Sequence, residues 1–394
     1  MSIIDKIAGH MDELVSLRQQ LHAHPEIGFE EHRTSDLITQ KLTEWGIDIT
    51  RGLGRTGVVG TLRRGDSNRS IGLRADMDAL PICETSKYAY SSKIANRMHA
   101  CGHDGHTTML LGAAQYLATS GSFDGIVHLI FQPAEETLLG ASAMLNDGLL
   151  EKFPCDSVFA LHNRPGLPVG KFAIRPGIMM AGGANFDINV KGKGGHAARP
   201  EQSIDPLLAI CHIVTALQSV AARNVSPLDT VVVSVTKIAS GDGYNTIPSV
   251  AYIAGTIRTL ESATMTLVRK SITRVVTEVA SGFGATAEID YKAVVPPLYN
   301  DEVETTAIAN AAAELVGEEN INRNGPILMS SEDFSFILER CKGAYINIGN
   351  GHGAATTPLH SADYDFNDAA IPFGAALLAR LAERKLPVSN GPEA

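Results

Sequence analysis

A chain of 394 residues is too long for a single small hydrophobic core, so we expect two or three domains. Hydrophobic residues make up 44% of the chain and charged residues 19%, as in ordinary globular proteins, which excludes a disordered or fibrous protein. The formal net charge of -10, with no long run among the 33 basic residues, disfavours nucleic acid as a partner and favours small-molecule chemistry.

The sequence predicts neither a membrane span nor a secretion signal. Its longest apolar runs, such as 126–131 and 231–235, are far shorter than the roughly 18 residues that a span requires. The first 24 residues carry acids and bases at helical spacing and lack the basic head and apolar stretch of a signal. We therefore expect a cytoplasmic protein that does not bind membranes. Five cysteines without a paired short spacing predict reduced thiols.

Helix-like and strand-like segments alternate in the first half of the chain. The predicted elements are, in chain order, helices over about 3–21 and 30–45, strands at 57–62 and 70–76, a helix after 106, a strand at 126–131, a helical stretch to 153 and a strand at 157–162. This alternation predicts an α/β fold with a largely parallel sheet.

The order of the predicted elements changes between residues 184 and 294. Strand, helix, strand, strand, helix and strand follow one another there, which is the order of a ferredoxin-like βαββαβ module. Glycines precede this module and Pro296 and Pro297 follow it, as expected of hinges around an inserted domain. The sequence therefore predicts one domain made of 1–183 and 295–394, into which the domain 184–294 is inserted.

Three predicted strands of the first domain end in side chains that could bind a metal ion or transfer a proton. These side chains are Asp76 and Asp78, Glu135 and Glu136, and His162. The carboxyl ends of strands in an open α/β sheet converge on the ligand crevice, so we expect these groups to meet there. A solvated strand end explains any one of them. Adjacent glutamates, however, repel each other unless a positive charge lies between them.

The segment MHACGHDGHTT, residues 98–108, gathers one cysteine and three histidines. Cys101 and His103 are two residues apart, so a loop could aim both at one ion, and thiolate and imidazole are good ligands for zinc, nickel or cobalt. For this motif alone, a buried thiol with capping histidines is the alternative. We interpret His99 and His106 as partners that support the ligands, and His128, inside a strand, as a core residue.

The adjacent Glu135 and Glu136 allow a division of labour. One would bind metal, and the other would stay free to take a proton from a metal-activated water. A water of lowered pKa is what the hydrolysis of an amide at neutral pH requires.

With these residues, the chain resembles the M20 metallopeptidases, and within them the amidohydrolases that include hippurate hydrolases, N-acyl-amino-acid amidohydrolases and plant indoleacetyl-amino-acid hydrolases. The resemblance covers nearly the whole chain and implies a catalytic α/β domain of zinc-peptidase-like architecture with an inserted lid or dimerisation domain. The matching segments are LHAHPEIGFEE (21–31), LRADMDALPI (73–82), MHACGHDGHTTMLLGAA (98–114), FQPAEETLLGA (131–141), ALHNRPGLPVG (160–170), GKGGHAARP (192–200), NTIPS (245–249), MSSEDFS (329–335) and PLHSADYDFND (358–368).

The resemblance also implies two divalent metal ions per subunit, which could be zinc, manganese, nickel or cobalt. Cys101 would bridge the two ions. The implied ligand set is completed by His103, Glu136, His162 and His360. Glu135 would be the general base, and Asp78 would orient the site. Asp76 stands where other branches of the family carry a metal-binding histidine, so it is left out of the ligands.

On the inserted domain, the resemblance assigns three further residues. His196 would stabilise the tetrahedral oxyanion, in some relatives by reaching across a dimer. Asn245 and Arg258 would bind the carboxylate of the substrate. We therefore expect a homodimer or higher homo-oligomer formed through this domain.

The predicted function is metal-dependent hydrolysis of the amide bond of N-acyl amino acids, with Glu135 as the base. A metallo-carboxypeptidase or dipeptidase on the same scaffold is the alternative enzyme. From another class of function, a non-catalytic protein that binds metal or ligand remains open. A nucleotide-dependent oxidoreductase is not favoured, because no GxGxxG motif follows an early strand.

Overall fold

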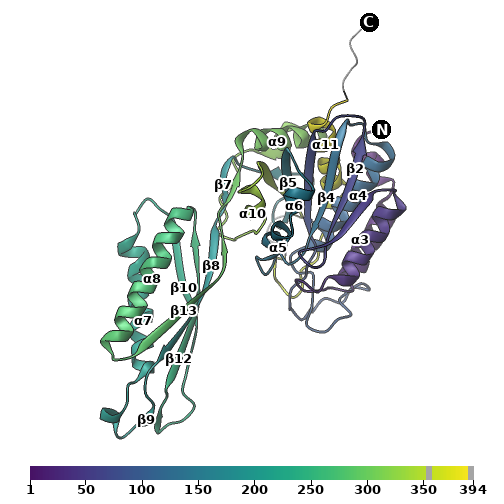
Figure 1. The fold of residues 1–394 in the computed structure, drawn as a ribbon. Coiled ribbons are helices and arrows are strands. Elements are labelled where there is room, and N and C mark those ends of the chain that lie inside the picture. The colour runs from purple at the N-terminus through teal and green to yellow at the C-terminus, as the bar shows by residue number, and fades with distance from the viewer. Residues whose placement is uncertain (352–356, 389–394) are drawn as a thin grey trace. The chain divides into compact units, whose positions relative to one another are not determined.

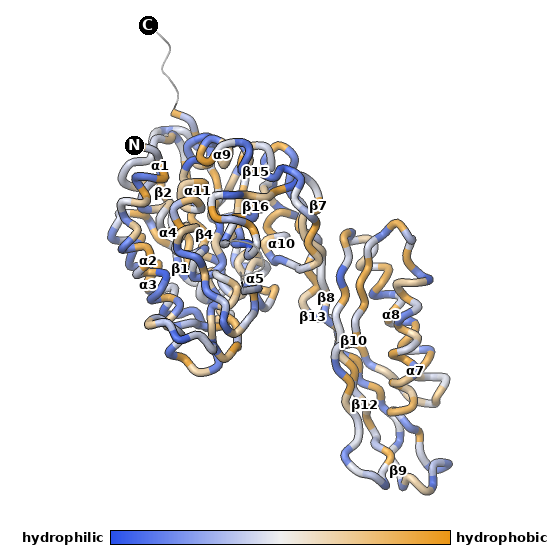
Figure 2. Tube along the Cα trace, turned by 180° about the vertical axis from the view of Figure 1, so that it is seen from behind, coloured by the Kyte–Doolittle hydropathy of each residue, from blue (hydrophilic) through white to orange (hydrophobic). Residues whose placement is uncertain are grey.

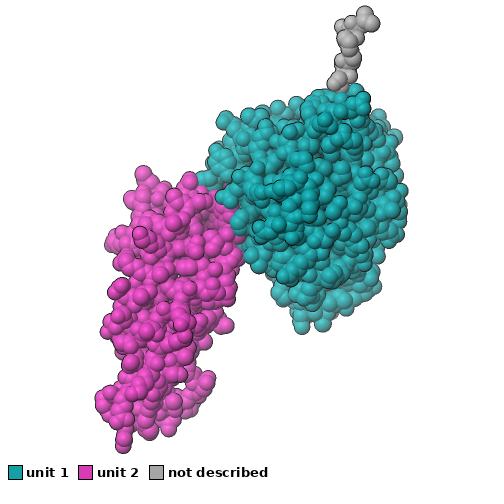
Figure 3. All heavy atoms as spheres, in the orientation of Figure 1, with its two compact units in different colours: residues 1–179, 299–326, 333–394 teal, residues 180–298, 327–332 magenta. Residues whose placement is uncertain are grey.

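The computed structural model describes residues 1–351 and 357–388. The chain forms two compact units (Figure 3). The first consists of Met1–Met179, Tyr299–Pro326 and Asp333–Ala394, and the second of Met180–Leu298 and Ile327–Glu332. The second unit thus extends a few residues beyond the predicted range 184–294 at both ends, and it includes a separate short segment that sequence patterns did not reveal.

An eight-stranded sheet forms the centre of the first unit (Figure 1). In spatial order its strands are β1 (Asp48–Leu53), β2 (Gly57–Arg64), β4 (Gly125–Gln132), β3 (Ser70–Asp76), β5 (Ser157–Arg164), β16 (Gly343–Gly349), β6 (Phe172–Ala173) and β15 (Ile321–Asn322). The pairs β4–β3, β3–β5 and β5–β16 are parallel, whereas β1–β2 and β2–β4 are antiparallel. The sheet is therefore mixed, and the largely parallel sheet that we predicted holds only for its centre.

Helices cover this sheet and protect its apolar strands from water. They are α1 (Ile3–Ala8), α2 (Met11–His22), α3 (His32–Glu44), α4 (His103–Ser120), α5 (Gly140–Asn146), α6 (Leu149–Lys152), α9 (Glu302–Val316), α10 (Ser335–Leu338) and α11 (Ile371–Lys385), with short 3-10 turns at Glu318–Asn320 and Asp368–Ala370. The helix predicted over 3–21 is two helices, because α1 ends at Ala8 with Gly9 as its C-cap and α2 begins at Met11. Helix α4 is buried along most of its length, and its Gly112 lets Ala375 of α11 approach closely.

The second unit has a four-stranded antiparallel sheet in the order β10-β12-β8-β13. Its elements are β8 (Gly182–Lys191), α7 (Pro206–Ser219), β10 (Val231–Ser240), β12 (Val250–Thr259), α8 (Ser262–Gly282) and β13 (Thr286–Val295), with a small hairpin sheet of β9 (Gly195–His196) and β11 (Thr246–Ile247) and short turns at Pro200–Gln202 and Val220–Asn224. This is the βαββαβ order that the sequence predicted. Helices α7 and α8 pack on one face of the sheet around an apolar core (Figures 1 and 2).

Strands β7 (Gly177–Met180) and β14 (Leu298–Asn300) pair where the chain passes between the units. In the described residues, one helical segment, Pro206–Asn224, is long and apolar enough to cross a membrane by length and composition. Core helices of globular proteins pass the same test, and 33% of this segment's most apolar window is buried.

Candidate metal centre

The ligand candidates lie at the ends of the central strands and at the start of α4. β3 ends at Asp76, and Asp78 follows two residues later. β4 ends at Gln132 and leads into the turn that carries Glu135 and Glu136, which we call the glutamate turn (133–141). His162 lies in β5, and His103 is the first residue of α4.

The structure brings the five predicted ligands together. Three overlapping groups of side chains offer ligand atoms that lie within 4.8 Å of one another. These groups are Cys101 with His103 and His162, Cys101 with Glu136 and His360, and His103 with Glu135 and Glu136. Because the groups share members, all five predicted ligands and the predicted base belong to one continuous cluster.

The cluster fits a divalent cation, as the surroundings of His103 show. Its Nε2 atom is buried and makes no hydrogen bond with the residues that the structure describes. Three carboxylate oxygens lie just beyond hydrogen-bond distance of it, on Asp76 at 3.8 Å, on Glu136 at 3.9 Å and on Glu135 at 4.0 Å. A buried polar atom without a partner is costly, and a cation between this nitrogen and the carboxylates would satisfy it.

Asp78 fixes the orientation of His103. Its Oδ1 atom lies 3.1 Å from Nδ1 of His103, and its Oδ2 accepts a hydrogen bond from the backbone N–H of Glu136 at 3.0 Å. When Nδ1 donates its proton to Asp78, Nε2 is left as the atom that can bind metal. Burial alone would lower the pKa of His103, but the nearby Asp76 and Asp78 raise it to about 10. The local field therefore attracts positive charge.

Cys101 and His162 face each other, with 3.4 Å between Sγ and Nε2. His162 donates from Nδ1 to its neighbour's carbonyl, the oxygen of Asn163, at 2.7 Å, which leaves Nε2 as an acceptor. Burial holds the pKa of His162 well below its usual value, so the ring is neutral. Burial and the two glutamates raise the pKa of Cys101. A thiolate at this position therefore needs a cation beside it.

Gly102 makes the turn between Cys101 and His103 possible. Its φ is +89°, and a Cβ atom there would lie 2.4 Å from the side-chain nitrogen of Asn163 and 2.7 Å from the hydroxyl of Tyr364. That same Asn163 nitrogen donates to the carbonyl of Cys101 at 2.6 Å. A left-handed glycine and a buried amide thus hold both ligand candidates in place.

His360 comes from the C-terminal part of the chain. Its Nε2 lies 3.4 Å from Oε1 of Glu136, its side chain is half exposed, and its backbone N–H donates to the carbonyl of Ala100 at 2.7 Å. Its φ of +65° is rare for a residue with a side chain. Strained backbone of this kind persists at sites where the surrounding structure holds a functional side chain.

Asp76 and His106 lie next to the ligand cluster and are held in place by hydrogen bonds. Asp76 accepts from Nη1 of Arg74 at 2.7 Å and from Nδ1 of His106 at 2.6 Å, so both of its oxygens are engaged. Nε2 of His106 accepts from the backbone N–H of Asn163 at 2.9 Å. Sequence reasoning missed Arg74, although a charged residue inside the apolar strand SIGLRAD was a signal. His99 is buried outside the ligand groups, and His128 is buried and bonded to Thr61.

The residues predicted on the inserted domain do not all meet within the second unit. His196 and Asn245 are neighbours, because His196 pairs with Thr246 and the N–H of Ala197 donates to the carbonyl of Asn245 at 3.0 Å. Arg258 lies opposite Gly183, at the other end of β12. At about 3.3 Å per strand residue, the two ends are roughly 25 Å apart.

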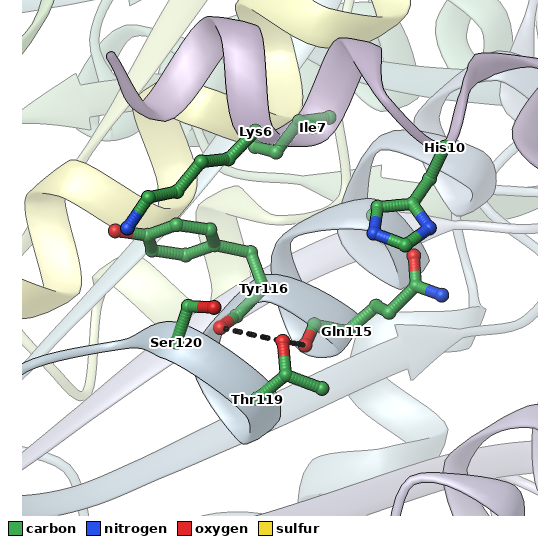
Figure 4. Close-up of a pocket in the computed structure, with 8 residues that line it drawn as sticks. Lys6, Ile7, His10, Gln115, Tyr116, Thr119 and Ser120 are labelled. Atoms are coloured by element: carbon green, nitrogen blue, oxygen red, sulfur yellow. Dashed lines mark hydrogen bonds between the residues drawn. The ribbon is translucent and has the colours of Figure 1, made fainter. Parts of the chain in front are cut away.

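The cavity in Figure 4 is separate from the cluster. It has a volume of about 30 Å³ between α1 and α4 and is lined by Lys6, Ile7, His10, Gly112, Gln115, Tyr116, Thr119 and Ser120. This volume suits a water molecule and not a substrate.

Comparison with known proteins assigns the chain to a family. The model of peptidase family M20/M25/M40 matches residues 72–384. A hippurate hydrolase of Campylobacter jejuni is 42% identical over 98% of this chain and 100% of its own length. The IAA-amino acid hydrolase ILR1-like 4 of Arabidopsis thaliana is 38% identical over 95% of this chain and 86% of its own.

A solved structure agrees with these relatives. The crystal structure of a dinuclear metal-binding peptidase from the M20 family of Bacillus subtilis is 32% identical, with a TM-score of 0.81 over 96% of this chain and 99% of that one. The resemblance drawn from the motifs is thereby confirmed. This chain belongs to peptidase family M20/M25/M40, and it is a metal-dependent hydrolase.

Proposed function

We propose that this protein hydrolyses the amide bond of N-acyl amino acids of the hippurate type and releases a carboxylic acid and a free amino acid. The relatives named above, a hippurate hydrolase and an IAA-amino acid hydrolase, support this substrate class. The observation that carries the proposal is the buried cluster of ligand atoms beside Glu135. A cytoplasmic location, as expected from the sequence, is part of the proposal.

The proposed site holds two divalent ions, of zinc, manganese, nickel or cobalt. The five predicted ligands, Cys101, His103, Glu136, His162 and His360, would hold them. Cys101 belongs to two of the ligand groups, one with His162 and one with His360, as a bridging ligand would. The dinuclear M20 relative supports the count of two. When bound, the ions supply a water of lowered pKa and polarise the amide carbonyl.

The chain's own residues then move the protons. Glu135 takes a proton from the attacking water and delivers it to the nitrogen of the leaving amine as the C–N bond breaks. Asp78 keeps His103 in the orientation that the site requires. His196 would donate a hydrogen bond to the oxyanion, and Asn245 and Arg258 would bind the substrate carboxylate.

In the proposed dimer, His196, Asn245 and Arg258 at one active site would come from two copies of the chain. Within one second unit, Arg258 lies roughly 25 Å along β12 from the end of that strand that follows Asn245 in the chain, at the usual rise per strand residue. If all three contact one small substrate, they come from different copies. β10 is an edge strand with Val232 and Ile238 exposed, which suits pairing with a second copy.

Mixing two inactive variants tests this sharing. We expect His196→Ala and Glu135→Gln to be nearly inactive alone but to regain activity when they are co-expressed with different tags. Half of randomly mixed dimers are hybrids, and each hybrid has one intact site, so about a quarter of wild-type activity should return. His10→Ala serves as a matched control with unchanged activity. Failure of the purified hybrid to regain activity would show that His196 acts within its own subunit.

A substrate panel separates the proposed activity from its alternative. We expect hippurate, acetyl and indoleacetyl amino acids to be cleaved with a higher kcat/KM than dipeptides with a free amino group, once the protein is loaded with each candidate metal in turn. A preference for dipeptides would instead favour the metallo-carboxypeptidase or dipeptidase. Binding of acyl amino acids without release of product would favour a non-catalytic binding protein.

A further inference from the structure

Two buried carboxylates hold the two ends of the glutamate turn (133–141). At the first end, Oε1 of Glu31 accepts a hydrogen bond from the backbone N–H of Ala134 at 2.8 Å. At the second end, Oδ2 of Asp333 accepts from the backbone N–H of Ala141 at 2.9 Å. Both carboxylates are completely buried. They come from segments about a hundred or more residues away in the chain, LHAHPEIGFEE and MSSEDFS, to which the proposed chemistry gives no role.

The turn needs such support because its backbone is strained. Ala134 and Leu138 both have positive φ values, of +54° and +59°, which are uncommon for residues with a side chain. Gly140 is equally constrained, since a Cβ atom there would lie 1.6 Å from the carbonyl oxygen of Pro133. Glu135 and Glu136 sit between these positions. The side chains of Glu135 and Glu136 point into the ligand cluster only while the backbone of the turn keeps this strained conformation.

Each carboxylate is itself fixed in place. The second oxygen of Glu31 accepts from the hydroxyl of Thr56 at 2.6 Å. The second oxygen of Asp333 accepts from the side-chain nitrogen of Gln132 at 2.7 Å, with Nη2 of Arg74 at 3.3 Å. Gly28, in the same segment as Glu31, packs so closely on Ala134 that a Cβ atom there would come within 3.0 Å. The partners therefore leave the carboxylates little freedom to move.

We infer that Glu31 and Asp333 are positioning residues, which clamp the glutamate turn so that Glu136 can bind metal and Glu135 can transfer protons. The inference rests on the proposed function for the roles of those two glutamates. The clamp itself rests on the hydrogen bonds at Ala134 and Ala141.

Variants of Glu31 separate the reach of this side chain from its charge. Glu31→Asp keeps the carboxyl group but is one methylene shorter, so the N–H of Ala134 loses its acceptor. Glu31→Gln keeps the length and an oxygen that can accept from Ala134, and its NH2 group can donate to Thr56. Burial raises the pKa of Glu31 to about 7, so the neutral form is already present at neutral pH. If the length of the side chain is what holds the turn, Glu31→Gln is tolerated and Glu31→Asp is not.

Kinetics and metal affinity are the first measurements. We expect Glu31→Asp to lower kcat and metal affinity by about 10- to 100-fold, as loss of a residue behind a ligand does, with KM nearly unchanged. Glu31→Gln should restore most of both. Glu26→Ala is the matched control, because Glu26 accepts from two backbone N–H groups of α3, those of Arg33 and Thr34, in the same segment. It should lower the melting temperature and leave kcat unchanged.

Hydrogen exchange in the metal-free protein tests the clamp without any turnover. Amides of the peptide 133–141 should exchange faster in Glu31→Asp than in wild type, and at the wild-type rate in Glu26→Ala. If Glu31→Asp fails to fold, Thr56→Val replaces it, since it frees the second oxygen of Glu31 and should give a smaller change of the same kind. Asp333→Asn should loosen the other end of the glutamate turn. Both oxygens of Asp333 accept hydrogen bonds, so the NH2 group of asparagine must face one of the donors, the N–H of Ala141 or the side-chain nitrogen of Gln132.

Wild-type kcat and wild-type exchange in Glu31→Asp would overturn the clamp. So would a loss in Glu31→Gln without a comparable loss in Glu31→Asp, which would mean that the charge of the side chain matters and its reach does not. Failure of the proposed function would give a different result. Glu135→Gln would then remain active, whereas hydrogen exchange in the peptide 133–141 would still show whether Glu31 holds the turn.

Discussion

Replacing Glu135 by glutamine is expected to abolish most turnover while both metal ions stay bound. Glutamine has the same size, so the fold is kept, but its amide cannot accept a proton from water. General base catalysis contributes about 10²- to 10⁴-fold, and kcat should fall by a factor in that range. Turnover of hippurate and elemental analysis of the same preparation check the two parts of this expectation.

The control for this variant is Glu151→Gln, which removes an exposed carboxylate paired with Arg340 and should change neither quantity. The metal analysis matters because Glu135 also belongs to a ligand group, with His103 and Glu136. Loss of metal in Glu135→Gln would make Glu135 a ligand instead of a base. Substantial remaining activity with both ions bound would remove it from the mechanism.

Much of the cluster could be predicted because the strands and their ends are local features of the sequence. Apolar runs located β3, β4 and β5, and the rule that strand ends converge brought Asp76, Glu135 and His162 together. The order of strands is not local. β4 lies between β2 and β3 and pairs antiparallel with β2, so the sheet is mixed, and no periodicity in the sequence distinguishes this arrangement from a parallel one.

His106 and Asp78 were predicted as supporting residues, but Glu31 and Asp333 escaped prediction for a similar reason. Glu31 and Ala134 are 103 positions apart, and Asp333 and Ala141 are 192 apart, so neither segment carries a local sign of its partner. From the sequence alone, a carboxylate is interpreted as a solvent-exposed charge, and only the fold shows that it is buried. The ligands themselves were recognisable because their residue types already imply metal chemistry. Supporting residues are defined only by what they contact.

The second large effect is expected at Cys101. Replacing it by alanine should remove both metal ions and all measurable turnover. In the described residues, Cys101 is the one side chain that belongs both to the ligand group with His162 and to the ligand group with His360. Aspartate keeps a negative ligand at this position, so Cys101→Asp should retain part of the metal. Elemental analysis and turnover are measured on each variant, with the exposed Cys83→Ala as control.

The number of ions lost decides whether Cys101 bridges. A ligand to one ion only would leave the other bound by its remaining side chains, and Cys101→Ala would then retain one ion per subunit. Loss of both is expected because, in the proposed site, the thiolate would compensate for two cations held close together among Glu136 and three histidines, and without it the cations would repel each other across the cluster. Retention of either ion in Cys101→Ala would therefore contradict the bridge, even if turnover were lost.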